Sequence, residues 1–486
     1  MLVALLLAAL ILTLLPSGSV GKNEAQRLSI TIALAHPERP FAPGAVGISL
    51  EDEELDSGDL DASHRSLVAL MRQLGPGVLR FGGGSVDSSW WTSRAERPPA
   101  WATSVITPAE LTTLRKLLTA TGWRAILGVN LGHFDPSRAA NEAQVSERIL
   151  GHRLLGFEIG NEPDKFSDPV VKLRPASYSL ADYLGELSRY SVAMFAAAPG
   201  IQLYGPDLSS QGWLRAIASD RAIPLTAITL HFYPTSYSIP KGACKGTPTP
   251  TAFEILSPQV RERENVVLQT LLSAGDFAQR ETRVDETNTT SSCDYHGGPA
   301  TSPVFASALW SFDWVLRAAS AGVAGLNFHG DFGHCAPDTF SPICARDVDA
   351  AAVGEVMARP EYYGLLAARE LEGGRFVSVG VSGHISPSNL TAFATLHSSG
   401  VVTLAVDNFA AHGSSVIALS VPGYRKATAQ RLLAPAVSST SGVTFGNASF
   451  DAAGGFRSKR TKLKMAADAF HFEMGPESAI VVTLAR

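Results

Sequence analysis

The sequence predicts a (β/α)8 TIM barrel joined to a C-terminal all-β sandwich domain, with an N-terminal strand linking the two. Between about residues 45 and 372, short apolar or β-branched segments alternate with longer segments of helical period. After Gly373 the helical period disappears, and short alternating segments follow one another between turn residues. Alternating strands and helices favour a parallel barrel, whereas a series of short strands favours a sandwich.

Eight segments have the composition of barrel strands: residues 45–49, 77–81, 124–130, 154–160, 201–205, 226–232, 282–285 and 323–328. Segments with helical period lie between and after them, at residues 63–74, 108–121, 140–151, 180–197, 210–218, 257–274, 303–320 and 361–371. Ser302 and Pro303 suit the N-cap and the first position of the helix over 303–320. Eight strand–helix repeats place the chemistry at the carboxyl ends of the strands.

The C-terminal region reads as strands only, at residues 376–381, 390–396, 401–406, 415–421, 429–433 and 479–484. Residues 28–34 (LSITIAL) precede the barrel but are also strand-like, so we expect them to pair into the same sandwich. These patterns divide the chain into residues 1–21, a signal peptide; 22–42, an N-terminal segment; 43–372, the barrel; and 373–486, the β domain.

The N-terminus indicates export from the cell. Residues 2–15 form one apolar run, which is short for a membrane span and typical of a signal peptide. Small, turn-prone residues follow at 16–19, as a cleavage region requires. The alternative is an uncleaved N-terminal anchor. No later segment of the sequence is long and apolar enough to span a bilayer, so we expect a secreted protein.

The composition predicts a folded protein with a large core, because 45% of the residues are hydrophobic and 17% are charged. The net charge of −5 argues against a nucleic-acid-binding protein. It does not distinguish neutral from anionic sugars, because a pocket can be locally basic on an acidic protein.

The cysteine spacing matches no zinc pattern, and we expect no metal and no cofactor. In an oxidising compartment four cysteines suggest two disulfides, Cys335–Cys344 and Cys244–Cys293. Four free thiols are the alternative if the chain is not exported. Three glycosylation sequons agree with secretion, at Asn288, Asn389 and Asn447.

The strongest local signal for chemistry is residues 156–164 (GFEIGNEPD), where the fourth predicted strand ends in Asn161, Glu162 and Pro163. Pro163 cannot continue a central strand, so Glu162 should lie at the barrel rim. A carboxyl group partly shielded from water there can have a raised pKa and act as an acid. A structural salt bridge is the plain alternative, but the Asn-Glu-Pro context favours a general acid/base.

A second carboxylate follows on the seventh strand, in residues 283–288 (RVDETN). Retaining glycoside hydrolysis needs two carboxyl groups about 5–5.5 Å apart, one acting as acid/base and the other as nucleophile. The ends of strands four and seven face each other across a barrel mouth, so Glu162 and Glu286 can meet. Because side chains alternate along a strand, only one of Asp285 and Glu286 should face the centre. Glu286 is nearer the rim and is the predicted nucleophile.

Together these residues resemble the clan A glycoside hydrolases, and within them family 79, the heparanase and β-glucuronidase family. The resemblance rests on four motifs in the order of the family: residues 79–91 (LRFGGGSVDSSWW), 159–164 (IGNEPD), 231–234 (HFYP) and 286–288 (ETN) followed by Gly297 and Gly298. They lie between about residues 47 and 330, and the C-terminal β domain also fits.

The resemblance implies a retaining β-glucuronidase that needs no cofactor, with a carbohydrate β-glucuronoside as its partner. Glu286 would attack the anomeric carbon, and Glu162 would protonate the leaving oxygen and then activate water. Asn161 would bind the 2-hydroxyl of the sugar, and Tyr233 would orient Glu286. Further substrate-binding residues are implied at Glu51, Asp87, Asn130, His231, Tyr295 and Gly297. Of these, Tyr295 and Gly297 belong to the loop expected to bind the substrate carboxylate.

Several of these positions have a structural alternative. Glu51 and Asp87 could equally be ion-pair partners. His329 stands near a position where the family suggests Tyr, so its role is open. Trp90 and Trp91 could stack on a sugar, although packing under the barrel rim is the commoner fate of such side chains.

Three functions remain from the sequence. An exo-acting enzyme would remove terminal β-D-glucuronosyl or 4-O-methylglucuronosyl residues from glycans or glycosides. A heparanase-like endo enzyme would need Lys and Arg clusters along its cleft, but the basic run at residues 457–464 lies in the β domain. Residues 234–257 could also close one end of the cleft. A catalytically silent glycan-binding protein is the third reading. The exo enzyme is the function that we expect.

Overall fold

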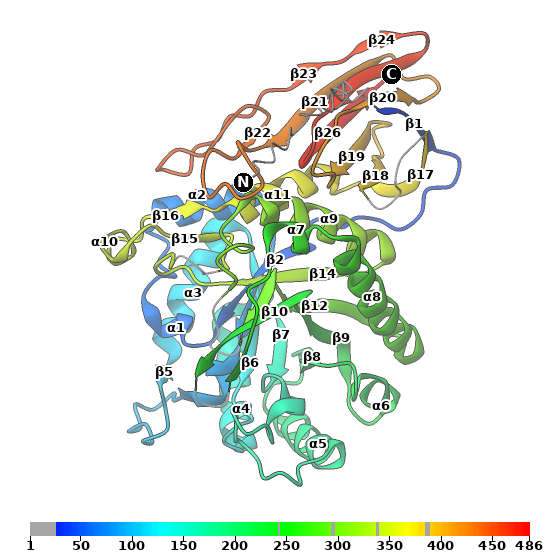
Figure 1. The fold of residues 1–486 in the computed structure, drawn as a ribbon. Helices are drawn as coiled ribbons and strands as arrows, with labels where there is room; N and C mark the ends of the chain where they lie inside the picture. The colour runs from blue at the N-terminus through cyan, green and yellow to red at the C-terminus, as the bar shows by residue number, and fades with distance from the viewer. Residues whose placement is uncertain (1–25, 242–243, 293–296, 337–339, 384–388) are drawn as a thin grey trace, which may run out of the picture.

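The computed structural model describes residues 26–241, 244–292, 297–336, 340–383 and 389–486 (Figure 1). Its centre is a closed barrel of eight parallel strands, as predicted. In order around the barrel these are β12 (Glu281–Thr287), β14 (Gly325–Gly330), β2 (Val46–Glu51), β3 (Val78–Gly82), β6 (Arg124–Val129), β7 (Leu154–Ile159), β8 (Leu203–Leu208) and β9 (Leu225–Phe232). Counted along the chain, β7 is the fourth barrel strand and β12 the seventh, so the two predicted glutamates come from the expected strands.

Helices surround the barrel, close to the predicted ranges: α2 (Arg65–Leu74), α3 (Pro108–Thr121), α4 (Pro136–Leu150), α5 (Leu180–Ala197), α6 (Leu214–Ser219), α8 (Pro258–Ala278), α9 (Phe305–Ala321) and α11 (Pro360–Ala368). Three shorter helices lie in connecting segments: α1 (Glu54–Ser57), α7 (Ala252–Ile255) and α10 (Val348–Ala352). Two long helices begin with a reciprocal capping box, Thr107 with Glu110 at α3 and Ser179 with Asp182 at α5. None of the described helices is long and apolar enough to cross a bilayer.

The prediction for the start of α9 was wrong. The helix begins at Phe305, and its N-cap residue Val304 makes no side-chain cap. Ser302, the predicted N-cap, instead accepts a hydrogen bond from the backbone N–H of Gly298 at 3.0 Å and contacts Thr289 Oγ1 at 2.7 Å. The Ser-Pro pattern therefore serves the loop after β12, where the hydroxyl satisfies a buried loop amide.

Short strands form within the loops that follow the barrel strands. The segment after β3 forms β4 (Ser89–Trp91) with β5 (Ser104–Ile106), and the segment after β14 forms β15 (Ile343–Ala345) with β16 (Val356–Ala358). After β9, β10 (Thr235–Lys241) and β11 (Cys244–Thr247) make a hairpin. β10 also pairs in parallel with β13 (Thr290–Ser292), which follows β12 in the chain.

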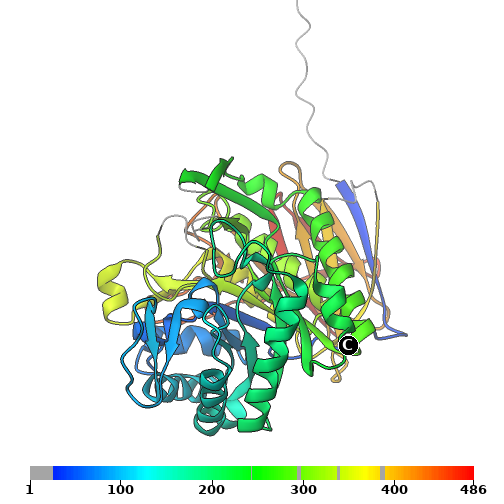
Figure 2. The same ribbon diagram turned by 90° about the horizontal axis from the view of Figure 1, so that it is seen from below.

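The β domain contains an eleven-stranded sheet that includes the N-terminal strand, as predicted. Its strands are β1 (Gln26–Ala33), β17 (Arg375–Gly383), β18 (Leu390–Leu396), β19 (Val402–Asn408), β20 (Ser415–Ser420), β21 (Lys426–Leu433), β22 (Thr444–Phe445), β23 (Thr461–Lys462), β24 (Lys464–Ala466), β25 (Ala469–Met474) and β26 (Ser478–Ala485). β1 pairs antiparallel with β17 and parallel with β20, between strands far away in the sequence (Figure 2). Leu28, Ile30 and Ile32 lie buried on its inner face with the core of the β domain.

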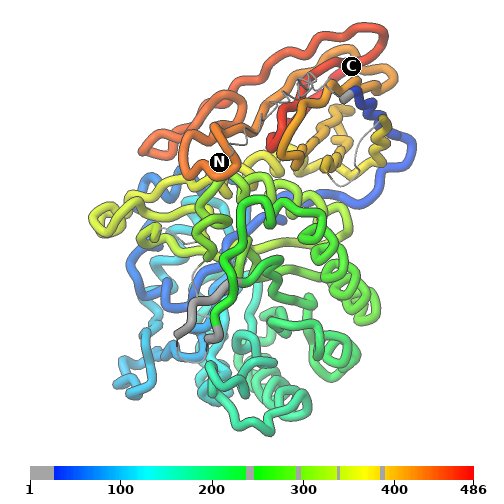
Figure 3. The backbone as a smooth tube through the Cα atoms, viewed as in Figure 1, coloured from blue at the N-terminus to red at the C-terminus, as the bar shows by residue number. Residues whose placement is uncertain are grey.

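The β domain packs directly on the barrel helices (Figure 3). At the start of α9, the backbone N–H groups of Phe305 and Ala306 donate to the carbonyls of Ser439 and Val437. Apolar side chains from both parts, among them Phe409 and Leu432, belong to one continuous buried cluster with α9 and α11. This packing fixes the start of α9, which follows the loop after β12.

Candidate active site

The two predicted catalytic glutamates meet at the mouth of the barrel. One oxygen of Glu162, one oxygen of Glu286 and a ring nitrogen of His231 all lie within 4.8 Å of one another. Glu162 follows β7 in the left-handed backbone region, with φ at 49°, and its N–H donates to the carbonyl of Asp207 at 2.9 Å. A non-glycine residue holds this conformation only when its surroundings enforce it, and such residues cluster at functional sites.

The strand that carries Glu286, β12, departs from simple alternation. Relative to β9, β12 contains one extra residue between Arg283 and Glu286, which is a β-bulge. As a result, both Asp285 and Glu286 face into the barrel, at 3.9 Å and 3.8 Å from the ring of His231. The prediction that only one of the two faces the centre was wrong, because the bulge resets the alternation. Glu286 lies in the catalytic pocket, and Asp285 is fully buried.

Glu286 is held as a carboxylate by several donors. Arg80 Nη1 donates to its Oε2 at 2.7 Å, and Tyr233 Oη donates to its Oε1 at 2.9 Å. This is the position next to Glu286 that the sequence predicts for Tyr233. Burial alone would raise the pKa of Glu286, but the charges of His231, His329 and Arg80 and the tyrosine hydrogen bond hold it well below its usual range. An ionised carboxylate with fixed orientation is the form that a nucleophile requires.

Arg80, on β3, organises the base of the site, and sequence reasoning assigned it no role. Its side chain is fully buried, with Nε donating to Glu158 at 2.6 Å and Nη2 donating to Asn161 Oδ1 at 3.1 Å. Nη2 also lies 3.5 Å from Asp207 Oδ2. An arginine at an inward strand position, within the motif at residues 79–91, was the available signal, because buried charges need partners.

Beneath the catalytic pair lie three buried carboxyl groups, Glu158, Asp207 and Asp285. Burial raises the pKa of Glu158 to about 7, and burial together with the charges of Asp285 and Glu158 raises that of Asp207 well above its usual value. Asp285 has a lowered pKa, because hydrogen bonding to Asp207 and the charges of His231 and Arg80 outweigh its burial. We infer that the three groups share protons, so that the single guanidinium of Arg80 can neutralise the cluster.

The pKa of Glu162 is shifted in the direction opposite to the one that the sequence predicts. His231 Nδ1 lies 3.1 Å from its Oε1, and Lys165 Nζ lies 2.8 Å from its Oε2. Burial favours a raised pKa, but the contacts with His231 and Lys165 outweigh it, so the pKa of Glu162 is lowered. The charge of Glu286 acts in the opposite direction and raises it. Lys165 was not among the predicted site residues, although it lies one turn after Glu162.

His231 joins the two glutamates. Burial lowers the pKa of its imidazole, but the charge of Glu286 and the hydrogen bond with Glu162 prevail and raise it to about 9. The described residues contain two groups with the spacing to hold a metal ion, and both include His231: one with Glu162 and Glu286, the other with Asp207 and Asp285. In this structure Arg80 already supplies positive charge to Glu286 and Asp207 at 2.7 and 3.5 Å.

Asn161 and Asp87 form a connected support. Asn161 lines the catalytic pocket, and because its Oδ1 accepts from Arg80, its amide donors are the groups left to serve a ligand. Asp87 lies buried and does not line this pocket. Its carboxylate accepts from the backbone N–H groups of Asn161, Leu131 and Gly132 at 2.7–3.2 Å. The structure thus places Asp87 where it positions Asn161 rather than where it would touch a sugar.

Glu51 and His329 also line this pocket and contact each other. His329 Nε2 lies 3.4 Å from Glu51 Oε1, and its Nδ1 lies 3.1 Å from Ser49 Oγ and 3.8 Å from Glu286 Oε2. Glu51 also accepts from the N–H of Ser85 at 2.8 Å. In the structure His329 therefore lies between Glu51 and Glu286, a position that the sequence did not specify.

Two neighbouring cavities share Glu51 and His329. The catalytic pocket, of about 170 Å³, is lined by Glu51, Gly84, Asn161, Glu162, Lys165, Ser209, His231, Tyr233, Glu286, Ser291, His329 and Phe340. A larger cavity, of about 510 Å³, shares Glu51, Gly84, His329 and Phe340 with it. Gly297 lines the larger cavity, and Tyr295 lies outside the described residues.

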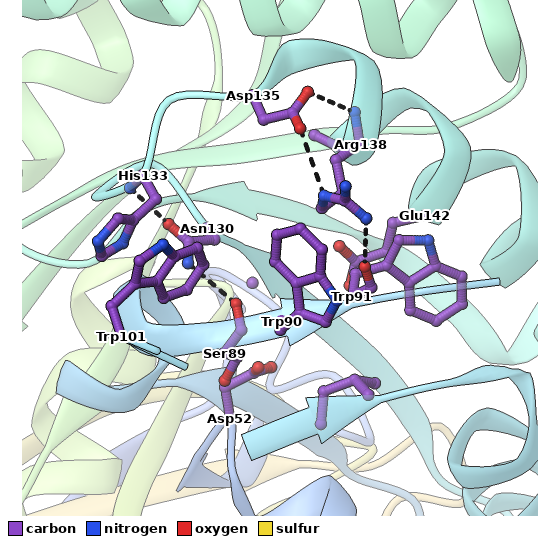
Figure 4. A pocket seen from close by; sticks show the side chains of 13 residues that line it. Asp52, Ser89, Trp90, Trp91, Trp101, Asn130, His133, Asp135, Arg138 and Glu142 are labelled. Carbon is purple, nitrogen blue, oxygen red and sulfur yellow. Dashed lines mark hydrogen bonds and ion pairs between the residues drawn. The ribbon is translucent and has the colours of Figure 1, made fainter. Parts of the chain in front are cut away.

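Asn130, Trp90 and Trp91 lie in a third place, a cavity of about 30 Å³ that contains neither glutamate (Figure 4). Asn130 donates to the carbonyl of Ser89 at 2.9 Å and accepts from the N–H of His133 at 2.8 Å. The guanidinium of Arg138 covers the ring of Trp90 at 3.5 Å. The space is about large enough for a water molecule. The structure therefore does not bring these three residues to the catalytic pocket.

Two further expectations concern the sequon at Asn288, just after β12, and the predicted disulfides. Asn288 is fully buried, and its side-chain amide donates to the carbonyl of His329 at 2.8 Å and to Glu361 at 3.1 Å, so its sequon is not accessible to glycosylation in the folded protein. The predicted disulfide Cys335–Cys344 is present. The predicted pair Cys244–Cys293 involves a residue outside the described part of the chain.

Chemically, the site offers an ionised, oriented carboxylate and a second carboxyl group within 4.8 Å of it. The second group has neighbours that can exchange protons with it and lies at the pocket surface. Such a pair can perform nucleophilic substitution at an acetal carbon with acid/base assistance.

No protein-family model matches the sequence, and the comparison with curated proteins gives no match. Solved structures do match. A 4-O-α-L-rhamnosyl-β-D-glucuronidase from Fusarium oxysporum 12S aligns over 94% of this chain and 100% of its own, with 16% identity and a TM-score of 0.72. A GH51 arabinofuranosidase from Xanthomonas axonopodis pv. citri aligns over 95% and 100%, with 13% identity and a TM-score of 0.68. The bifunctional glucanase-xylanase CelM2, from a metagenome library, aligns over 94% and 99%, with 12% identity and a TM-score of 0.63. These likenesses establish that the chain has the barrel-and-β-domain fold of these three proteins.

Proposed function

We propose that the protein is a retaining glycoside hydrolase. The observation that carries the proposal is the separation of the two carboxyl groups, whose oxygens lie within 4.8 Å at the mouth of a parallel barrel. Retaining enzymes place these groups about 5–5.5 Å apart, whereas inverting enzymes leave roughly 6.5–9.5 Å for a water molecule. The short separation supports a covalent glycosyl-enzyme intermediate.

In the first step, Glu286 attacks the anomeric carbon while Glu162 protonates the departing oxygen. Arg80 and Tyr233 keep Glu286 ionised and aimed until the new carbon–oxygen bond forms. The ester that results carries no charge, so Glu286 no longer opposes the lowering of the pKa of Glu162 by His231 and Lys165. Glu162 then becomes the stronger acid and remains ionised, which suits the second step, where it takes a proton from the attacking water.

We further propose that the sugar released is a β-D-glucuronosyl residue and that the chain is a member of family 79. The order of the four sequence motifs supports this, as does the activity in the name of the Fusarium oxysporum protein that shares the fold. Gly297, on the loop expected to bind the carboxylate, lies buried at the wall of the larger cavity.

Exo action is the favoured mode. The β10–β11 hairpin pairs through β10 with β13, and Ser291 of β13 lines the pocket, so the hairpin is the segment that would close one end of the cleft. The exposed basic residues of the run at 457–464 belong to the β domain, and Arg460 pairs with Glu370 at 2.6 Å. Secretion is part of the same proposal, and the disulfide Cys335–Cys344 agrees with an oxidising compartment.

The test uses aryl β-glycosides of glucuronic acid, glucose, galactose and xylose, run beside heparan sulfate. We expect the glucuronide to be cleaved fastest and NMR to show the β-anomer as the first product. A 2-deoxy-2-fluoro glucuronosyl reagent should label the peptide that carries Glu286. Replacement of Glu286 or Glu162 by Ala should lower the rate by several orders of magnitude, because the two groups act as a unit. An α-anomer as first product would exclude the retaining mechanism. A wild-type rate in Glu286→Ala would exclude Glu286 as the nucleophile.

If no glycoside is cleaved while glucuronides still bind, the chain is the catalytically silent glycan-binding protein that the sequence left as an alternative. Faster cleavage of internal bonds of heparan sulfate than of aryl glucuronides would favour the endo alternative.

A further inference from the structure

Glu162 and Asp207 are both held in the left-handed backbone region, near the carboxyl ends of the neighbouring strands β7 and β8. Their φ angles are 49° and 55°. A non-glycine residue keeps this unfavourable conformation only where other contacts enforce it. The N–H of Glu162 donates to the carbonyl of Asp207 at 2.9 Å, so one backbone hydrogen bond joins the two residues directly. The position of Glu162 therefore depends on what holds these two chain segments together.

Asp207 is supported by the strand on its other side. Its N–H donates to Thr229 Oγ1 at 2.9 Å, and the hydroxyl of Thr229 donates to Asp207 Oδ1 at 2.5 Å. Thr229 belongs to β9, and both residues are buried. The carboxyl group of Asp207 also lies 3.5 Å from the guanidinium of Arg80. The end of β8 is thus a firmly held, buried support for the turn that carries Glu162.

The side chain of Asp164, two residues after Glu162, links this turn to β8 a second time. Asp164 Oδ1 accepts from the N–H of Ser209 at 3.1 Å. Its Oδ2 accepts from the hydroxyl groups of Ser209 and Ser210 at 2.9 and 2.7 Å. Both serines directly follow β8. Three donors from the segment after β8 therefore converge on one carboxylate of the Glu162 turn.

The link also concerns the catalytic pocket, because Ser209 and Glu162 both line it. A movement of the turn relative to β8 would change the position of the Glu162 carboxyl group against this wall. Acid/base catalysis requires hydrogen-bond reach to the departing oxygen, and a displacement of about 1 Å can lower the rate by about 100-fold. The loop after the turn has a separate anchor, because Phe166 is 1% exposed and belongs to the barrel core. Loss of Asp164 should therefore release the turn without unfolding the loop.

We propose that Asp164 is a positioning residue for the acid/base, which holds Glu162 in its left-handed turn by linking that turn to Ser209 and Ser210. Asp164 itself does not line the catalytic pocket, so it acts through Glu162 rather than on the substrate. This role rests on the proposed function, in which Glu162 is the acid/base. It adds a requirement that the contacts of Glu162 with His231 and Lys165 do not contain.

The experiment measures how the rate depends on the leaving group. Phenyl β-D-glucuronide has a leaving group that needs protonation, whereas the leaving group of 2,4-dinitrophenyl β-D-glucuronide departs without it. In Asp164→Ala we expect kcat/KM for the phenyl glycoside to fall by about tenfold or more. For the dinitrophenyl glycoside, kcat/KM should stay within about twofold of the wild-type value.

Azide tests the second step of the same reaction. In Asp164→Ala, water attacks the glycosyl-enzyme slowly because its base is displaced, whereas azide needs no base. Azide forms the new bond to the anomeric carbon, and the Glu286 carboxylate leaves. We therefore expect azide to raise kcat of Asp164→Ala with the dinitrophenyl glycoside and to give β-glucuronosyl azide. The wild type should show no such increase.

Two variants serve as controls. Asp164→Asn keeps an acceptor for the N–H of Ser209 and should recover most of the rate with the phenyl glycoside. Asp168→Ala lies on the same loop and is exposed, and its carboxylate accepts from the N–H of Val170 at 2.8 Å within that loop. This matched control should leave both rates unchanged. An Asp164→Ala protein that melts like the wild type and loses the same fraction of both rates, or none, would overturn the proposal.

Ser210→Ala replaces Asp164→Ala if the latter does not fold. Ser210 is exposed and does not line the pocket, and its loss removes the donor at 2.7 Å. We expect about a threefold loss with the phenyl glycoside alone, and unchanged rates with both substrates would overturn the proposal. If the wild type cleaves neither glucuronide, the proposed function fails, and the crystal structure of the folded variant decides the positioning role separately. Loss of the 3.1 Å contact between Glu162 Oε1 and His231 Nδ1 supports it, and an unmoved Glu162 turn excludes it.

Discussion

Arg80 Nη1 donates to Glu286 Oε2 at 2.7 Å, although the two residues come from strands on different sides of the barrel. The same guanidinium holds Glu158 through Nε at 2.6 Å. Arg80 thus connects Glu286, the proposed nucleophile, to the carboxyl groups beneath it. Because all three side chains are buried, this contact is as important for folding as for the position of the nucleophile.

Replacing Arg80 should therefore affect stability and activity together. Arg80→Ala removes the cation from a buried acidic cluster, and we expect unfolding to become easier by about 3–5 kcal/mol in a denaturant titration. Arg80→Lys keeps the charge but loses the planar set of donors, so it should be more stable than Arg80→Ala and still lose about 100-fold in kcat. Arg148→Ala, on the exposed side of α4, is the control. Wild-type stability in Arg80→Ala would contradict the assignment.

Tyr233→Phe keeps the ring and removes one donor to Glu286. Without this hydrogen bond the carboxylate is less favoured, so the pKa of Glu286 rises toward its usual value. The acidic limb of the kcat/KM profile, which reports protonation of the nucleophile, should move to higher pH. We also expect kcat to fall by about tenfold or more. Tyr424→Phe, in the β domain, should change neither quantity. A lower kcat with no movement of the acidic limb would indicate that Tyr233 only fills space.

Lys165→Ala tests the environment of the acid/base. Its ammonium group lies 2.8 Å from Glu162 Oε2 and favours the ionised form. Removing this charge raises the pKa of Glu162, so a larger fraction carries a proton at any given pH. The alkaline limb of kcat/KM should therefore move to higher pH, most clearly with an alkyl glucuronide, whose poor leaving group needs protonation. Lys116→Ala, exposed on α3, is the control. Movement of the limb to lower pH would contradict the assignment.

The sequence predicts the barrel well because strands alternate with helices over eight repeats, so an error in one repeat does not change the overall pattern. The sequence also predicts that Glu162 and Glu286 meet at the barrel mouth, since both stand at strand ends in distinctive local contexts. The bulge in β12 was not predictable in this way, because one extra residue in a strand pair leaves no periodic signal. Both Asp285 and Glu286 therefore face inward, which alternation had excluded.

The supporting residues were harder to predict for a second reason. Asp87 lies in the short helical turn after β3, and Asn130 directly follows β6, where substrate ligands are expected. Their side chains are instead hydrogen-bonded to backbone groups of neighbouring loops. In the sequence Arg80 is one charged residue within an apolar strand, and its contacts with six polar residues become visible only when distant strands are assembled. Position along a strand predicts depth in the barrel, whereas hydrogen-bond partners depend on the loops.

The buried carboxyl groups predict how stability depends on pH. Burial raises the pKa of Glu361 to about 8 and that of Glu264 to about 8, and it raises that of Glu158 to about 7. Between their unfolded value near 4.5 and these folded values, the folded protein binds more protons than the unfolded chain. Stability from these groups is fully present below the unfolded pKa and is lost as pH rises through the folded pKa. The lowered pKa of Glu286 acts in the opposite sense, because its contribution is lost as pH falls below the usual range.

We therefore expect the melting temperature to be highest near about pH 5 and to fall toward pH 8. Glu361→Gln isolates one contributor. Its amide oxygen can still accept from Asn288, as Glu361 Oε2 does at 3.1 Å, but the side chain no longer titrates. The fall in melting temperature between pH 6 and pH 8 should be smaller in this variant, whereas Glu262→Gln, exposed on α8, should behave like the wild type. A melting temperature that rises from pH 5 to pH 8 would show that the buried carboxyl groups are ionised in the folded protein, and the proton sharing inferred beneath Arg80 would then be wrong.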